Sequence, residues 1–239
     1  MRDLPYDDPA VLIFLLLPIV LLAALTWAAV VAWRRDGRSR AAAGRVGATC
    51  AIAGMLWMSL TWQTAENGVL RQWGRTPPPF AIFVVAILAL ALLIALTPLG
   101  AHIARHVALW ALVAIQGFRL PLELAMHTLY ERGIMPEQMS YSGRNFDIVT
   151  GISAIAVAAL AATGRGGRRL VMAWNILGLG LLLNIIIVAI LSTPRVQYFG
   201  PDRLNTFVTY TPFVWLPAVM VLAALAGHLL VFRALRARR

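Results

Sequence analysis

Apolar runs long enough to cross a lipid bilayer recur along the whole sequence. A hydrocarbon core about 30 Å thick requires roughly 20 apolar residues in a helix. Hydrophobic residues occupy 60% of the 239 positions and charged residues 13%, whereas a soluble domain has about 45–50% and about 25%. We therefore predict an all-α, polytopic membrane protein with one transmembrane domain over residues 1–239. Its seven predicted transmembrane helices cover about 10–33, 46–64, 80–98, 107–130, 148–163, 170–191 and 212–232.

The residue types exclude several classes of protein. All 21 basic residues are arginine, and without lysine the chain cannot form the retinal Schiff base of a light-driven rhodopsin. The single Cys50 excludes an internal disulfide and a cysteine metal cluster. The N-terminal MRDLPYDDPA lacks the positive region of a signal peptide, so the first apolar run is expected to span the membrane.

The arginines predict how the chain is oriented. With the N-terminus outside, thirteen arginines lie on inner segments and seven on outer ones. The positive-inside rule therefore predicts that the C-terminus lies on the cytoplasmic side of the membrane, which we expect to be a bacterial inner membrane. This loop distribution also argues against nucleic-acid binding as the reason for the net charge of +11. The inner set is Arg34, Arg35, Arg38, Arg40, Arg45, Arg105, Arg165, Arg168, Arg169, Arg233, Arg236, Arg238 and Arg239, and the outer set is Arg2, Arg71, Arg75, Arg132, Arg144, Arg195 and Arg203.

The fourth predicted helix carries charge inside the membrane. At 100° per residue, Gln116, Arg119, Glu123, His127 and Tyr130 share an arc of about 80°, which is one narrow stripe of a helix. Because a charge at the bilayer centre costs at least ~2.5–3.5 kcal/mol, the stripe should face the bundle interior or a cavity.

Pro121 and the spacing of the charges give two compatible interpretations of this helix. A proline removes a helical hydrogen bond and predicts a kink between Gly117 and Pro121. Arg119 and Glu123 are four residues apart and are expected to pair. The pair is either a structural lock within the bundle or the border of a polar pocket that opens outward.

Other predicted helices deliver polar residues to the same outer depth as Glu123. Glu66, with Gln63, ends the second helix, Asn145 and Asp147 precede the fifth, and Asn184 lies in the sixth. Each also has an ordinary structural role open to it. Asn145 or Asp147 can cap a helix, Asn184 can bond to another helix, and Glu66 can be a solvated loop carboxylate.

The histidines offer two weaker metal hypotheses. His102 and His106 are four residues apart, and His228 is predicted at similar depth, as a metal or haem site would require. Glu123 and His127, joined by Glu66 or Asp147, are the candidate ligands of an outer metal site. No sequence motif for a zinc protease, a phosphate-binding loop, a dinucleotide fold or a serine hydrolase is present, so no cofactor is identified.

Four segments carry a resemblance to a known group of proteins. They are FRLPLEL at 118–124, GRNFDIVTGISA at 143–154, AWNILGLGLLLN at 173–184 and PFVWLP at 212–217. The chain resembles a family of uncharacterised bacterial seven-helix membrane proteins. Ser142 stands where those relatives tend to have a glutamate. The resemblance implies fold and membrane location and no particular activity.

Three function classes follow from these residues. The first is a non-catalytic membrane protein that binds or transports a small polar or ionic ligand in an outward-facing pocket. In it, Arg119 anchors the ligand, Glu123 and His127 titrate, and Gln116, Asn145, Asp147 and Asn184 form hydrogen-bonding walls. The alternatives are a membrane-embedded, metal-assisted enzyme that uses Glu123, His127 and Asp147, and a structural subunit whose polar stripe contacts a partner helix.

Overall fold

The computed structural model describes residues 5–237, and in that part of the chain the protein is all-α, without strands. Six helices are long and apolar enough to cross a membrane. The α-helices are α1 (Pro9–Arg35), α2 (Arg40–Glu66), α3 (Pro79–Leu96), α4 (Pro98–His106), α5 (Leu109–Ala114), α6 (Arg119–Glu131), α7 (Ile148–Ala162), α8 (Arg168–Leu191) and α9 (Leu222–Ala237).

The first and third helices begin within one residue of their predicted starts, whereas α2 begins at Arg40, six residues before its predicted start at residue 46. Asp8 caps α1, since its Oδ1 accepts a hydrogen bond from the Ala10 amide at 2.9 Å. Ser39 caps α2 in the same way through Ala42. The helix α3 begins at Pro79, as expected for a proline in a first turn.

The predicted third helix ends two residues early, and a short helix that was not predicted follows it. Thr97 is extended, and α4 then begins at Pro98. The turn is tight, because a Cβ on Gly100 would lie 2.2 Å from the Ala95 carbonyl oxygen. The helix α4 packs on α1, α3 and α9 instead of continuing along the bundle.

Two predicted helices contain irregular turns. The fourth runs from Leu109 to Glu131 as α5, a 3₁₀ turn η2 (Ile115–Phe118) and α6, so the helix is irregular in the segment where a kink was expected. The seventh begins at Leu216 and not at Pro212, because residues 211–214 form a turn. Its first six residues form a π-helix, η6 (Leu216–Val221), which leads into α9.

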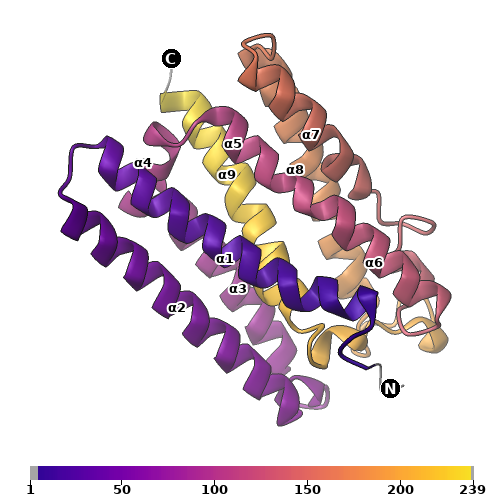
Figure 1. Cartoon of the computed structure of the whole chain (residues 1–239). Coiled ribbons are helices and arrows are strands. Elements are labelled where there is room, and N and C mark those ends of the chain that lie inside the picture. The colour runs from indigo at the N-terminus through magenta and orange to yellow at the C-terminus, as the bar shows by residue number, and fades with distance from the viewer. Residues whose placement is uncertain (1–4, 238–239) are drawn as a thin grey trace.

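The helices run between two ends of the bundle (Figure 1). One end carries the α1–α2 loop, α4, the α7–α8 turn and the C-terminal end of α9, and we call it the arginine-rich end. The chain enters at the opposite end, where α1 begins, and we call this the N-terminal end. The helix α7 has only 15 residues, yet it packs along α5, η2, α6 and α8.

The C-terminal helix forms the centre of the bundle. We compared the most apolar 18-residue stretch of each long helix. In the segment Leu216–Ala237, 72% of that stretch is buried, whereas in α2 only 17% is buried. The helix α2 therefore lies at the edge, where it packs mainly against α1 (Figure 1). The charged segment of α6 faces this centre, which positions the site described next.

Candidate functional site

A cluster of three charged side chains is buried inside the bundle. Arg119, Glu123 and Asp147 are 1%, 2% and 5% exposed. Arg119 and Glu123 lie on α6, and Asp147 directly precedes α7. Since isolated charges inside a membrane are costly, these side chains must be stabilised by each other or by a ligand.

Arg119 forms its ion pair with Asp147 across two helices. Its Nη1 donates to Asp147 Oδ1 at 2.8 Å. Thr150, one turn into α7, donates to the same oxygen at 3.2 Å. Asp147 precedes the first turn of α7, where a negative charge is favourable.

The expected pairing of Arg119 with Glu123 was wrong. Among the described residues Glu123 has no ion pair, and its Oε2 accepts a hydrogen bond from Asn145 Nδ2 at 2.7 Å. Asn145 also orders the loop, because its Oδ1 accepts from the Asp147 amide at 3.1 Å. The segment 140–147 thus supplies a partner to each of the two buried groups on α6, Arg119 and Glu123, and spacing along one helix could not show this.

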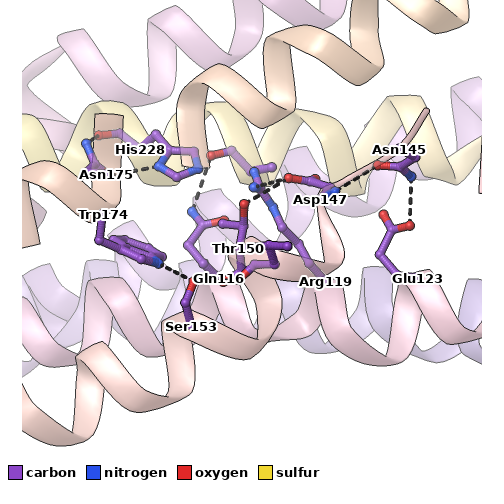
Figure 2. Close-up of polar contacts among 12 residues, drawn as sticks. Gln116, Arg119, Glu123, Asn145, Asp147, Thr150, Ser153, Trp174, Asn175 and His228 are labelled. Carbon is purple, nitrogen blue, oxygen red and sulfur yellow. Dashed lines mark hydrogen bonds and ion pairs between the residues drawn. The ribbon is translucent and has the colours of Figure 1, made fainter. Parts of the chain in front are cut away.

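The polar contacts continue inward from this cluster (Figure 2). The figure shows a row of side chains from Glu123 and Asn145 at one side to Asn175 and His228 at the other. His228 Nδ1 lies 2.8 Å from Asn175 Oδ1, and Asn175 Nδ2 donates to the His228 carbonyl oxygen at 3.0 Å. Gly178 lets α8 approach closely, because a Cβ there would lie 2.6 Å from His228 Cε1 and 2.8 Å from Thr150 Cγ2.

Arg119 keeps hydrogen-bonding capacity that its protein partner does not use. Its Nε and Nη2 are buried and have no hydrogen-bond partner among the described residues. An unpartnered buried donor costs about 1–3 kcal/mol, more when it is charged. Such atoms are therefore candidate contacts for a ligand or for ordered water.

A cavity borders this cluster, and we call it the charged cavity. It has an empty volume of about 840 Å³, counting the part that is open to the outside. Its walls come from α3, α6, α8, η6 and α9 and are mostly apolar. Five polar residues line it: Arg119, Glu123, Asn145, Asp147 and Asn205. The cavity thus combines hydrocarbon walls with one group of charges.

Comparison with known proteins gives a family for this chain. Residues 78–236 match the model of a domain of unknown function, DUF8737. The chain belongs to the DUF8737 family. No curated protein matches the sequence, and no solved structure matches it. Every residue that lines the charged cavity lies within the matched DUF8737 segment.

Four predicted site residues of this DUF8737 protein lie outside the lining of the charged cavity. Gln116 is buried deeper, where its Nε2 donates to the Ala224 carbonyl at 3.3 Å. Asn184 donates to the Arg144 carbonyl at 2.8 Å and connects a helix to a loop. Glu66 is exposed and accepts a hydrogen bond from the Thr211 hydroxyl.

His127 is the fourth of these residues, and its predicted place in the pocket was wrong. The ring stacks on Tyr141, with centroids 4.3 Å apart, and Nδ1 lies 2.9 Å from Ser140 Oγ. His127 lies one helical turn beyond Glu123 on the same face, and this step along the axis brings it against the loop that covers the end of α6. Ser142 is part of the same contact, 3.5 Å from Nδ1.

The histidines expected at one depth lie in two different places. His102 and His106 flank Asp36, with Nε2 to carboxylate distances of 3.2 and 3.3 Å. His228 instead lies in the buried polar row. Within residues 5–237, no group of three or more His, Cys, Asp or Glu side chains has the geometry to hold a metal ion.

Sequence reasoning missed three polar residues of this region. Thr150 and Asn175 belong to the buried row, and their signal was an uncharged polar residue inside a predicted span. Asn205 lines the charged cavity, is 1% exposed and has an unpartnered Oδ1. It lies in the loop between α8 and η6 with no distinguishing pattern, so only the fold could reveal it.

Proposed function

We propose that this DUF8737 protein spans a bacterial inner membrane seven times and binds a ligand in the charged cavity. The seven crossings are the six long apolar helices and α7, with the N-terminal end outside and the arginine-rich end inside. Support for the orientation comes from the arginine distribution. The ligand carries a polar or ionic group, as the sequence predicted.

One observation carries the binding proposal. Arg119 is almost fully buried and lines a cavity, yet two of its three side-chain nitrogens have no partner in the described part of the chain. A guanidinium that served only as a structural lock would have these donors satisfied by protein. A ligand oxygen at the cavity wall would satisfy them.

The remaining walls define what the rest of the ligand is like. Most lining residues are aliphatic or aromatic, including Phe80, Leu182 and Met220. Ligand sites usually combine such walls with a few placed polar groups. The ligand therefore has a polar group at Arg119 and Asp147 and an apolar body.

The burial of Arg119 and Glu123 weighs against the structural-subunit hypothesis. Both side chains are covered within this one chain. These two charged groups are therefore not available to a partner helix.

The test is native mass spectrometry of the protein released from its own membranes in detergent. We expect a bound molecule of defined mass on the wild-type protein. Ala189→Phe places a large side chain in the charged cavity and should reduce the bound fraction at least tenfold. Ala81→Phe, on an exposed position of α3, is the matched control and should bind as the wild type does.

Thermal melting confirms that both variants fold. An empty wild-type protein, or equal occupancy of Ala189→Phe and the wild type, would overturn the proposal.

A further inference from the structure

A second cavity lies beside the first, and we call it the apolar cavity. It has an empty volume of about 1520 Å³, counting its open part, and lies among α1, α2, α3, α5 and α9. Its walls are almost entirely hydrocarbon, and no charged residue lines it. Its size and chemistry match neither water nor a polar solute.

The apolar cavity opens sideways out of the bundle. Trp27 on α1 and Ala53 on α2 line it and are both exposed. The helix α2 packs mainly on α1, whereas α3 packs mainly on α9 and α4, so the space between α2 and α3 is bridged by side chains, such as the rings of Trp57 and Phe83 with centroids 6.4 Å apart, and not closed by direct helix packing. In a membrane this side of the bundle faces lipid, and the chemical group available to fill an apolar opening there is a hydrocarbon chain.

Phe118 lies where the two cavities meet. It lines both of them and directly precedes Arg119. The π-helix η6 also borders both, with Met220 and Val221 toward the charged cavity and Ala218 and Val219 toward the apolar one. A 3₁₀ turn and a π-helix thus form the junction, and such irregular turns within helices frequently mark functional sites.

The two cavities follow one another along the bundle. On α3 the charged cavity is lined between Phe80 and Leu88, and the apolar cavity at Leu90 and Ile94. The fourteen helical steps from Phe80 to Ile94 correspond to a rise of about 21 Å, a large part of the hydrocarbon thickness of about 30 Å. One extended molecule with a polar end can therefore occupy both.

We infer that the ligand is an amphiphile drawn from the bilayer, whose acyl chain lies in the apolar cavity and whose polar group reaches Arg119 past Phe118. The inference rests on the proposed binding at Arg119 and names the ligand class. Oxygen atoms of the polar group accept hydrogen bonds from Nε and Nη2 of Arg119. The acyl chain of the ligand enters between α2 and α3.

The test uses acyl chains that can be located. Cells that produce the protein are grown with hexadecanoic acid bearing a diazirine at the chain end, which is incorporated into the membrane lipids. After irradiation, cross-linked peptides are mapped by mass spectrometry. We expect adducts on cavity-lining positions such as Leu22, Cys50 and Leu90, and the adduct mass gives the polar group.

Two variants on the same helix make the result specific. Ala53→Trp fills the opening and should reduce adducts within the apolar cavity at least tenfold. Leu56→Trp changes a position that is 66% exposed and does not line the cavity, and it should leave those adducts unchanged.

Adducts confined to exposed positions such as Leu56 and Val85, or undiminished adducts in Ala53→Trp, would overturn the inference. Loss of the bound molecule in Ala189→Phe tests the charged cavity separately. The proposed function therefore stands if that loss is seen while the acyl adducts fail to appear.

Discussion

The Arg119 guanidinium donates to the Asp147 carboxylate at 2.8 Å, and both side chains are almost completely buried. The contact joins α6 to the start of α7 in the middle of the charged cavity wall. The contact occupies Nη1 of the guanidinium, and in the described part of the chain Nε and Nη2 have no hydrogen-bond partner. The structural role and the proposed binding role therefore meet in a single pair of residues.

The first prediction is that Arg119 and Asp147 are energetically coupled. Arg119→Gln or Asp147→Asn alone should each lower the free energy of unfolding by about 3–5 kcal/mol, because the partner is left as an uncompensated buried charge. The double variant should lose less than the sum. Thermal or denaturant unfolding in detergent measures the cycle.

The matched control for this cycle is the Asp8–Arg132 pair, which lies nearer the surface. Its coupling should be about 0–1 kcal/mol. Additive losses for Arg119 and Asp147 would show that the two side chains do not stabilise each other.

The second prediction concerns a close approach between helices. A Cβ on Gly151 would lie 2.5 Å from the Leu120 backbone nitrogen, and a backbone atom cannot rotate away. Gly151→Ala should therefore destabilise the protein by about 1–3 kcal/mol. In a thermal melt, an unchanged midpoint would show that α7 can move away from α6 without loss.

Gly180→Ala is the control for this glycine. No atom lies within 4 Å of a Cβ at that position of α8. Alanine in a helix interior is more stable than glycine by roughly 0.5–1 kcal/mol, so this variant should melt at or above the wild-type temperature.

The third prediction concerns pH and the start of α1. Partial burial raises the pKa of Asp8, but hydrogen bonds from Arg132 and from the Ala10 amide outweigh it, so the pKa lies below its ordinary value of 3.8. A lowered folded-state pKa contributes stability above the unfolded pKa that is lost as pH falls through the folded value.

Asp8→Asn isolates this charge, because asparagine also caps helices well. The wild type should be more stable than the variant by about 1 kcal/mol or less at pH 7. The difference should shrink as the pH is lowered below about 4. Unfolding curves at several pH values decide the matter, and a difference that grew toward low pH would contradict the assignment.

The fourth prediction concerns orientation in the membrane. Reporters fused at Gly37, Gly166 and the end of α9 should be cytoplasmic, and reporters at Gly74 and Gly133 should be external. The reason is the arginine asymmetry between the two ends. A cytoplasmic signal from Gly133 would reverse the proposed topology.

Much of the helical framework could be predicted from the apolar runs alone. The predicted helices 10–33 and 170–191 correspond to Pro9–Arg35 and Arg168–Leu191. The agreement is expected because the thickness of the bilayer sets the length of apolar sequence that a spanning helix needs. The burial of Arg119 and Glu123 could also be predicted, since charges in a span avoid lipid. The helix α4 was not predicted, because its His102, Arg105 and His106 interrupt the apolar pattern and resemble a loop.

The identity of contacts was the part that local patterns could not predict. The i,i+4 rule pairs Arg119 with Glu123, but the choice between that partner and Asp147 depends on where the loop before α7 lies. His127 shares the helical stripe with Glu123, yet the loop at Ser140 and Tyr141 captures its ring. Periodicity gives the face of a helix, whereas partners depend on packing between helices.

The lining of the two cavities divides the chain in an unexpected way. All walls of the charged cavity come from residues 80–224, inside the segment that matches DUF8737, whereas the apolar cavity also needs α1 and α2, which lie before that segment. The proposed site for a polar group therefore depends on the matched segment alone, whereas the proposed site for a hydrocarbon tail depends on residues inside and before that segment. Relatives that keep residues 78–236 but pair them with different leading helices would retain the same chemistry at Arg119 while accepting tails of another length or shape.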